Sequence, residues 1–156
     1  MNNTYLPKGL PIPVPQQDGL DRPYWEAVRR NELQIQKCRD CSSWQWGPEW
    51  ICHNCRSFNM FWECVEPKGA IYSWERSWHP VHPALKKHGP YLVVLVELPH
   101  AGKTRMIGNL LGDPFQNVII GTEVEAVFEQ HENTLVPYTL VQWQIPDINE
   151  NCKIKF

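Results

Sequence analysis

Two short cysteine motifs, Cys38-Arg39-Asp40-Cys41 and Cys52-His53-Asn54-Cys55, decide what the first third of this chain folds around. In each motif two residues separate the cysteines, which places both sulfurs on one side of a tight turn. Two such turns supply four thiolates, the number that a tetrahedral zinc site needs. Ten residues separate the two pairs, enough for the hairpin of a zinc ribbon. The predicted metal ligands are therefore Cys38, Cys41, Cys52 and Cys55.

Four thiolates fill the coordination sphere of zinc and leave no open position for water or substrate. We therefore expect the Zn²⁺ to be structural. Tetrahedral sulfur sites also accept iron, as in a rubredoxin-like electron-transfer site, but that alternative leaves the rest of the chain without a role. The remaining cysteines, Cys64 and Cys152, stand alone, and neither is expected to be a nucleophile.

Upstream of the cysteines we expect a proline-rich arm and a short helix. Residues 1–17 hold four of the 14 prolines, which fix φ and remove backbone donors. Asp21 is the expected helix cap, and one apolar helix face carries Tyr24, Trp25 and Val28. Alternating residues then predict strands over 33–37 and, more weakly, 60–65, on either side of the cysteine pairs.

After Pro67-Lys68-Gly69 the pattern changes to longer β segments. Five are expected, over residues 70–78, 91–98, 104–111, 122–129 and 135–143. Five antiparallel strands with no strong helix among them fit a small barrel, and the five-stranded OB-fold is the leading candidate. The predicted fold is mainly β, divided into arm and helix (1–34), zinc ribbon (35–66), OB-fold (67–145) and C-terminal tail (146–156).

The loop between the first two barrel strands, residues 78–90, is the candidate binding loop. It holds three of the six histidines and two adjacent lysines. Such a loop can meet anionic phosphates or orient a substrate carbonyl, although a solvated, proline-stiffened connection has the same composition. The residues singled out as CoA-binding or partner-facing are Trp78, His79, His82, Lys86 and Lys87. His79 and His82 have a metal-ligand spacing, but no third ligand lies near them in the sequence.

Eight tryptophans are more than a core of this size easily buries. Four of them, at 44, 46, 50 and 62, lie in or beside the expected ribbon. They either form a small core around the metal or anchor a protein interface, where tryptophan is enriched. The composition leaves both possibilities open.

Charge and apolar runs exclude several classes of protein. With 15 basic and 17 acidic residues the formal net charge is −2, which argues against a surface built to neutralise nucleic-acid phosphates. The longest apolar run, Tyr91 to Val96, is far too short to span a membrane. Prolines interrupt any N-terminal signal sequence, so we expect a soluble, cytoplasmic protein.

The order of helix, four-cysteine ribbon and barrel resembles the rubredoxin-like zinc-ribbon plus OB-fold family of acyl-CoA-associated proteins. The resemblance covers about residues 20–130. It rests on the two cysteine motifs and on further short motifs in the same order: Tyr24-Trp25, Trp46-Gly47-Pro48, Gly69-Ala70-Ile71-Tyr72-Ser73, Gly89-Pro90-Tyr91, Met106-Ile107-Gly108-Asn109-Leu110, Ile120-Gly121, Val124 and Val127-Phe128. Two positions depart from the family pattern: Ser42 stands where glycine is frequent, and Glu49 where a basic residue is frequent.

The resemblance implies a non-catalytic accessory subunit of a thiolase-fold enzyme, a thiolase or an aldolase, in a hetero-oligomer. The partner supplies the nucleophile, the ribbon binds the partner, and the barrel helps to bind the CoA substrate. Family members accompany enzymes that degrade steroids or aromatic hydrocarbons, including thiolases of the benzoylsuccinyl-CoA type. The residues agree on one point: the sequence contains no nucleophile elbow, Walker loop or dinucleotide fingerprint.

Two other functions remain open from the sequence. A single-stranded nucleic-acid binder is the alternative, because OB barrels and zinc ribbons both bind single strands. The many aromatic residues favour this function, since bases stack on them, whereas the net charge of −2 argues against it. A free-standing enzyme that uses the histidine loop for acid and base chemistry is the other.

Overall fold

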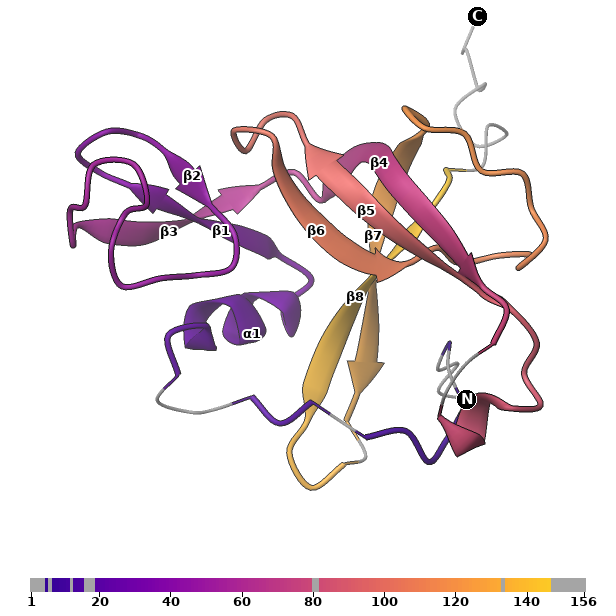
Figure 1. Ribbon diagram of the computed structural model, residues 1–156. Coiled ribbons are helices and arrows are strands. Elements are labelled where there is room, and N and C mark those ends of the chain that lie inside the picture. The colour runs from indigo at the N-terminus through magenta and orange to yellow at the C-terminus, as the bar shows by residue number, and fades with distance from the viewer. Residues whose placement is uncertain are drawn as a thin grey trace, which may run out of the picture.

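The computed structural model describes residues 5, 7–11, 13–15, 19–79, 82–132 and 134–146. Within them the chain is mainly β, as predicted, with one α-helix before the strands (Figure 1). The elements in order are α1 (Arg22–Val28), β1 (Leu33–Cys38), β2 (Trp44–Gln45), β3 (Met60–Val65), β4 (Lys68–Ser77), the 3₁₀ turn η1 (Pro83–Leu85), β5 (Tyr91–Leu98), β6 (Thr104–Asn109), β7 (Glu123–His131) and β8 (Tyr138–Gln144). Among the described residues no helix is long and apolar enough to cross a membrane.

The ribbon is a three-stranded antiparallel sheet in the order β2-β1-β3. β1 lies in the middle and pairs with β3 over its whole length, from Leu33 opposite Val65 to Cys38 opposite Met60. Side chains alternate between two faces of a strand. Leu33 and Ile35 are therefore on one face and are fully buried, and helix α1 packs against β1 (Figure 1).

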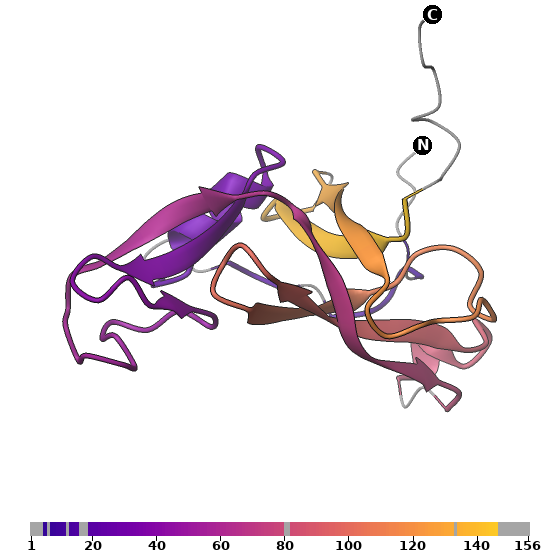
Figure 2. The same ribbon diagram turned by 90° about the horizontal axis from the view of Figure 1, so that it is seen from above.

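The barrel is a five-stranded antiparallel sheet in the order β6-β5-β4-β7-β8. β4 is the longest strand and pairs with β5 along its length, but with β7 only from Lys68 to Ala70. A β-bulge between Ile71 and Ser73 lets β4 bend and take part in both halves of the barrel. Figure 2 shows β4 crossing the molecule beside the β7–β8 hairpin.

Closure of the barrel depends on the contact between β6 and β8. A parallel bridge joins Leu110, just after β6, to Trp143 of β8, and the Leu111 amide donates to the Trp143 carbonyl at 2.7 Å. Because this contact is a single bridge rather than a ladder, the barrel is nearly closed, the arrangement expected of an OB-fold.

Ribbon, helix and barrel share one hydrophobic core. It contains Tyr24 and Val28 from α1, Leu33 and Ile35 from β1, and the inward residues of the barrel strands. The β5–β6 turn also reaches the ribbon: a Cβ on Gly102, which has φ +63°, would lie 2.6 Å from the Trp44 ring. Glycine here allows both the turn and its close packing against the ribbon.

Three details differ from the sequence-based expectations. Asp21 is at the helix N-cap but makes no side-chain cap; its carboxylate instead accepts a hydrogen bond from Trp25 Nε1 at 2.7 Å. The last barrel strand begins at Tyr138 rather than at residue 135, since residues 134–136 form bends. Strand β2 was not predicted, because two residues are too short to show alternation.

Cys152 and all of the expected tail after Pro146 lie outside the described residues.

Candidate metal centre and partner-facing surfaces

The four predicted ligands meet at one end of the ribbon. All four sulfurs lie within 4.8 Å of one another, with Cys38 Sγ 3.6 Å from Cys55 Sγ and Cys41 Sγ 3.5 Å from Cys52 Sγ. Cys38 and Cys52 are buried, whereas Cys55 is exposed. A tetrahedron of sulfurs about 2.3 Å from a central zinc has edges of about 3.8 Å, close to these separations.

The two cysteine turns have the same backbone geometry, fourteen residues apart. Ser42 N donates to Cys38 O at 3.0 Å and, equivalently, Arg56 N donates to Cys52 O at 2.9 Å. Ser42 and Arg56 both have φ +62°. Glycine adopts this left-handed conformation at the lowest cost. The geometry therefore explains why glycine is frequent at the position of Ser42.

The ionisation of the sulfurs fits a cation at the centre. Hydrogen bonds from the Ser43 hydroxyl and backbone amide lower the pKa of Cys41 to about 5. For Cys55, the Ser57 backbone amide acts to lower the pKa, but the neighbouring Cys41 sulfur and the other thiols outweigh it and raise the pKa to about 12. Four thiolates this close together repel one another, and a divalent cation removes that repulsion. The residues present therefore fit a structural zinc ion.

Side chains around the centre tie its two turns together. The Asp40 carboxylate accepts hydrogen bonds from Ser57 Oγ at 2.5 Å and Asn59 Nδ2 at 2.9 Å, and these bonds lower the pKa of Asp40. Asn54 Nδ2 donates to Ser43 Oγ at 3.1 Å, which links the second turn back to the first. These contacts join the two cysteine turns to each other and to the start of β3.

Two buried glutamines hold the loop between the cysteine pairs, and no sequence pattern indicated them. Gln36 bonds both backbone groups of Glu49: its Nε2 donates to the Glu49 carbonyl at 2.9 Å, and its Oε1 accepts from the Glu49 amide at 3.0 Å. Gln45 similarly donates to the Ile51 carbonyl and accepts from the His53 amide. Two buried amide side chains therefore hold the backbone of the loop that carries Trp50.

The ribbon tryptophans divide between core and surface. Trp44, Trp46 and Trp62 pack against the core, and Trp46 lies edge-on to Tyr24 with ring centroids 4.8 Å apart. Trp50 is 68% exposed, and nearby Phe58 is 78% exposed. Both line a cleft of about 370 Å³ together with residues of the α1 N-terminal end and of β3. Trp44, Trp46 and Trp62 therefore belong to the core, whereas an interface role for the exposed Trp50 stays a prediction.

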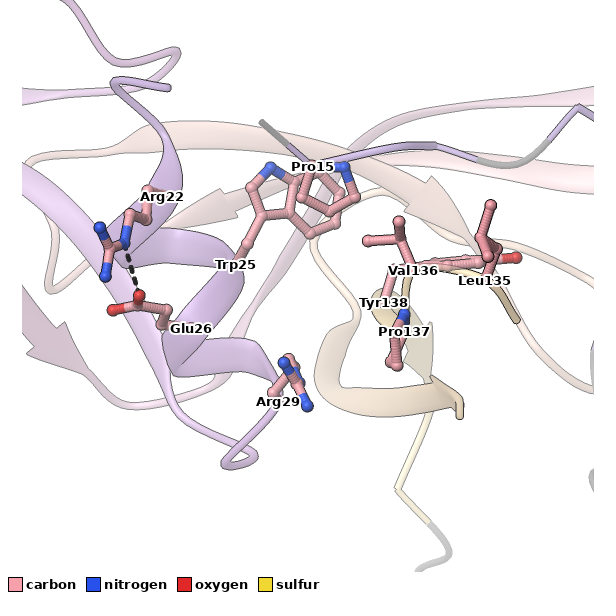
Figure 3. Close-up of a pocket in the computed structure, with 9 residues that line it drawn as sticks. All are labelled: Pro15, Arg22, Trp25, Glu26, Arg29, Leu135, Val136, Pro137 and Tyr138. Atoms are coloured by element: carbon pink, nitrogen blue, oxygen red, sulfur yellow. Dashed lines mark hydrogen bonds and ion pairs between the residues drawn. The ribbon is translucent and has the colours of Figure 1, made fainter. Parts of the chain in front are cut away.

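A second cleft, of about 490 Å³, lies between α1 and the β7–β8 turn (Figure 3). Trp25 and Pro15 face Val136 across it, while Arg22 is turned toward Glu26, with which it forms an ion pair at 2.6 Å. Leu135, at the tip of the turn, is 99% exposed. The cleft itself was not predicted from the sequence, since its walls come from three separate segments; of its residues Trp25 was singled out, but only for the apolar face of the helix and for the family resemblance.

The histidine loop extends from the far end of β4. Trp78 is 55% exposed, and its ring lies 5.8 Å from that of Phe115. His82 Nδ1 accepts a hydrogen bond from the Ala84 amide at 3.2 Å and so caps η1, and Leu85 is buried below it. His79, Lys86 and Lys87 are exposed. Among the described residues, the four ribbon cysteines form the only cluster of three or more metal-ligating side chains, so the pair His79 and His82 gains no third ligand there.

A buried carboxylate on β7, not predicted from the sequence, binds the N-terminal arm. Glu129 Oε1 accepts hydrogen bonds from the Tyr5 backbone amide and from His131 Nε2, both at 3.0 Å, and Glu129 Oε2 accepts from Gln142 Nε2 at 2.8 Å. The Tyr5 hydroxyl donates to the Leu110 carbonyl at 3.2 Å. Tyr5 is therefore attached to the barrel beside the β6–β8 closure.

Comparison with known proteins gives two family matches. Residues 25–60 match the family described as ChsH2, rubredoxin-like zinc ribbon domain, and residues 62–129 match ChsH2, C-terminal OB-fold domain. Together the two models cover most of the described chain, in the order in which the structure places the ribbon and the barrel.

Two curated relatives are similar in sequence. A probable enoyl-CoA hydratase alpha subunit of Thermomonospora curvata is 37% identical over 122 residues, 76% of this chain and 35% of the relative. A DUF35 domain-containing scaffold protein of Methanocaldococcus jannaschii is 31% identical over 98 residues, 60% of this chain and 65% of the relative. This chain thus spans about a third of the first relative's length.

Two solved structures share the architecture. A chain of the Ltp2-ChsH2(DUF35) aldolase is 30% identical, with a TM-score of 0.69 over 86% of this chain and 98% of that one. A DUF35-family protein of unknown function from Sulfolobus solfataricus has a TM-score of 0.59 over 83% of this chain and 87% of that chain. At 12% identity, the second likeness concerns the fold alone.

Proposed function

Since the chain belongs to the ChsH2 (DUF35) family of zinc ribbon and OB-fold proteins, we propose that it is a non-catalytic accessory subunit of a thiolase-fold enzyme that acts on acyl-CoA. The observation that carries the proposal is the likeness to a chain of an Ltp2-ChsH2(DUF35) aldolase over almost that chain's whole length. The name of the Thermomonospora relative, an enoyl-CoA hydratase subunit, also connects the family with acyl-CoA chemistry.

The side chains best suited to catalysis, namely the ribbon cysteines, His82, Glu129 and His131, take part in contacts that stabilise the fold. The four-cysteine centre offers four thiolates, which satisfy a zinc ion completely. His82 caps η1, and the pair Glu129 and His131 is bonded to Tyr5 and Gln142. These contacts favour an accessory rather than a catalytic role, with the nucleophile supplied by the partner.

The exposed aromatic residues of the ribbon are the proposed docking surface for the partner. Trp50 and Phe58 are large and exposed. Trp50 lies on the loop that the glutamine bonds hold, and Phe58 lies just before β3, three residues after the metal ligand Cys55. Rigid exposed aromatics lose little conformational entropy on binding and are typical anchors of protein interfaces.

The loop after β4 is the proposed contact with acyl-CoA. Lys86 and Lys87 are exposed next to η1 and can pair with phosphates, and Trp78 with Phe115 offers an aromatic surface. His79 and His82 complete the set of loop residues that we propose to face CoA or the partner. We further propose a cytoplasmic location, substrates from steroid or aromatic degradation (a benzoylsuccinyl-CoA type among them), and domain boundaries at 34/35, 66/67 and 145/146.

The test is purification of the tagged chain from its native host, with mass spectrometry of co-purifying proteins and metal analysis. Recovery of a thiolase-fold protein with about one zinc per copy of this chain supports the proposal. Recovery with single-stranded nucleic acid, in a complex that dissociates steeply as salt is raised, contradicts it and supports the alternative function.

A further inference from the structure

The outer side of β3 is an open edge of the ribbon sheet. β1 lies in the middle of this sheet, so β3 has a neighbouring strand on one side only. Figure 2 shows β3 on the outline of the ribbon. The pairing of β3 with β1 runs from Met60 to Val65 in one register, without a bulge that would turn the edge away. Open edges expose unpaired backbone groups that readily accept another strand.

The backbone groups of Trp62 and Cys64 point away from β1. The Arg39 amide donates to the Asn59 carbonyl at 2.9 Å, which makes these two residues a hydrogen-bonded pair of the antiparallel ladder. Since such pairs alternate along a ladder, every second residue after Asn59 bonds to β1, and the intervening Trp62 and Cys64 face outward. Within the part of the chain that the structure describes, their amides and carbonyls meet no hydrogen-bond partner on the outer side.

The features that usually protect a sheet edge are missing from β3. Proteins blunt their edges with proline, with exposed lysine, with bulges or by keeping the edge strand short. β3 contains neither proline nor lysine, and its one charged residue, Glu63, already forms an ion pair with Lys37 at 2.8 Å. By contrast, β2 is only two residues long, and β6 and β8 face each other where the barrel closes. The edge of β3 is therefore suited to pairing with a further strand.

We propose that two copies of the chain pair along β3, antiparallel and about a two-fold axis, so that their ribbons form one continuous sheet. Only outward-facing residues can exchange hydrogen bonds across the new contact, so they must lie opposite one another. Two registers that satisfy this condition overlap five of the six residues of β3, one centred on Trp62 and the other on Glu63. A two-fold contact of this kind closes on itself and gives a dimer rather than a filament.

The charges beside β3 select the register centred on Trp62. The other register puts Glu63 directly opposite Glu63 of the second copy, and like charges opposite each other are destabilising. The Trp62 register instead puts Glu63 opposite Phe61 of the second copy, whose ring carries the Arg39 guanidinium 4.1 Å from its centroid. Among the described residues, the Arg39 side chain forms no ion pair. Arg39 of each copy can therefore pair with Glu63 of the other.

The opposite face of the sheet gives apolar contacts in the same register. The two Trp62 side chains lie opposite each other, and Cys64 lies opposite Met60, an arrangement in which cross-strand aromatic pairs are stabilising. Met60 and Trp62 line the cleft of about 370 Å³, which leaves room beside them for side chains of the second copy. The Trp62 pair exchanges two backbone hydrogen bonds, and each Cys64 amide donates to a Met60 carbonyl. This dimer does not depend on the proposed function.

A disulfide across the contact tests the register. Met60→Cys places a thiol opposite Cys64 of the second copy, and Cα atoms of a hydrogen-bonded pair lie about 5.5 Å apart, within the range that a disulfide spans. Under mild oxidation, the isolated full chain with this substitution should form a covalent dimer on a non-reducing gel while its zinc content stays unchanged. Met60→Cys/Cys64→Ala is the matched control and should lose the covalent dimer.

Analytical ultracentrifugation over a dilution series tests the backbone and charge contacts. Cys64→Pro removes the outward amide but no bond to β1, and edge strands tolerate proline at such positions. The dissociation constant of the dimer should rise at least about tenfold, whereas Cys64→Ala, which keeps the amide, should not change it. Arg39→Glu should also weaken the dimer, because the new carboxylate repels Glu63 of the second copy. Lys103→Glu, the same change of charge on the β5–β6 turn, should not.

A chain that is monomeric at every concentration, with no covalent dimer from Met60→Cys, would overturn the proposal. A dimer that is equally stable in the Cys64→Pro variant would also overturn it, because the contact would then lie elsewhere. Protection of the Trp62 and Cys64 amides from hydrogen exchange that arises only when the partner enzyme is added would overturn it too, and would assign the edge to a strand of the partner.

Discussion

The absent side chain of Gly108 makes room for the indole of Trp143: a Cβ on Gly108 would lie 2.7 Å from Trp143 Cδ1. Trp143 is fully buried and belongs to the bridge with Leu110 that closes the barrel. Close packing at this point therefore holds the two halves of the barrel together, in a core where interiors tolerate little added volume.

Replacing Gly108 by valine should destabilise the barrel. The added methyl groups meet the Trp143 ring and the Val141 carbonyl, and overpacking of this kind costs about 1 to 3 kcal/mol. Urea unfolding followed by tryptophan fluorescence measures the effect. The adjacent Ile107, which is 70% exposed, provides the control: Ile107→Ala should change the free energy of unfolding by less than about 0.5 kcal/mol.

Loss of one metal ligand should unfold the ribbon and release the partner. Cys38→Ser removes a buried thiolate from the four that surround the zinc site, and structural zinc stabilises small modules through its binding free energy. Bound zinc and co-purification of the partner are the measurements. Cys64→Ser, a change at an exposed cysteine outside the cluster, should leave both unchanged. A Cys38→Ser chain that still assembled normally would contradict the prediction.

Gln36→Leu should loosen the loop that carries Trp50. The substitution removes both hydrogen bonds to the Glu49 backbone, and each such bond contributes a net stabilisation of about 0.5 to 1.5 kcal/mol. Hydrogen exchange should rise at Glu49, and partner affinity should fall without loss of zinc. Gln34→Leu, at the exposed amide that bonds Cys64, is the matched change on the same strand and should have little effect.

Partner affinity should depend on the exposed ribbon aromatics. Trp50→Ala and Phe58→Ala should each weaken binding by about 2 kcal/mol or more, the size of a hot-spot effect, with the fold retained. Leu135→Ala removes a fully exposed apolar side chain at the other cleft and serves as the comparison. If Leu135→Ala weakens binding and the ribbon variants do not, the partner docks against α1 and the β7–β8 turn.

Lys86→Ala/Lys87→Ala should raise the KM of the complex for acyl-CoA by about tenfold while kcat changes little. The two lysines are proposed to contact phosphates, whose charge is the same in the ground state and in the transition state. Removing the lysines should therefore weaken the binding of both states equally, which raises KM and leaves kcat unchanged. Lys103→Ala, at the exposed β5–β6 turn, is the control. A fall in kcat with an unchanged KM would place these lysines away from CoA.

The periodic features of the sequence predicted most of the fold. Spacing of the cysteines identified the metal cluster, and alternation located β1, β3 and the barrel strands to within a few residues at most ends. Strand ends were the weak point: Leu135 continues the apolar pattern, yet it is exposed at a turn. A pattern of apolar residues records burial on average and does not show where a strand pairs.

Contacts between distant segments could not be predicted. Gln36 with Glu49 and Tyr5 with Glu129 are polar contacts whose partners have no fixed spacing in the sequence. The clefts could not be predicted for the same reason: their walls come from distant segments. Trp25 of α1 and Val136 of the β7–β8 turn face each other only in the folded structure. Burial of a polar side chain becomes visible only in the tertiary structure.

The most direct test of the accessory role is turnover of acyl-CoA by the purified complex, by the partner alone and by this chain alone. We predict turnover by the complex, reduced or absent turnover by the partner alone, and none by this chain. Turnover by this chain alone that is abolished by His79→Ala or His82→Ala would contradict the account and identify the histidine loop as an active site.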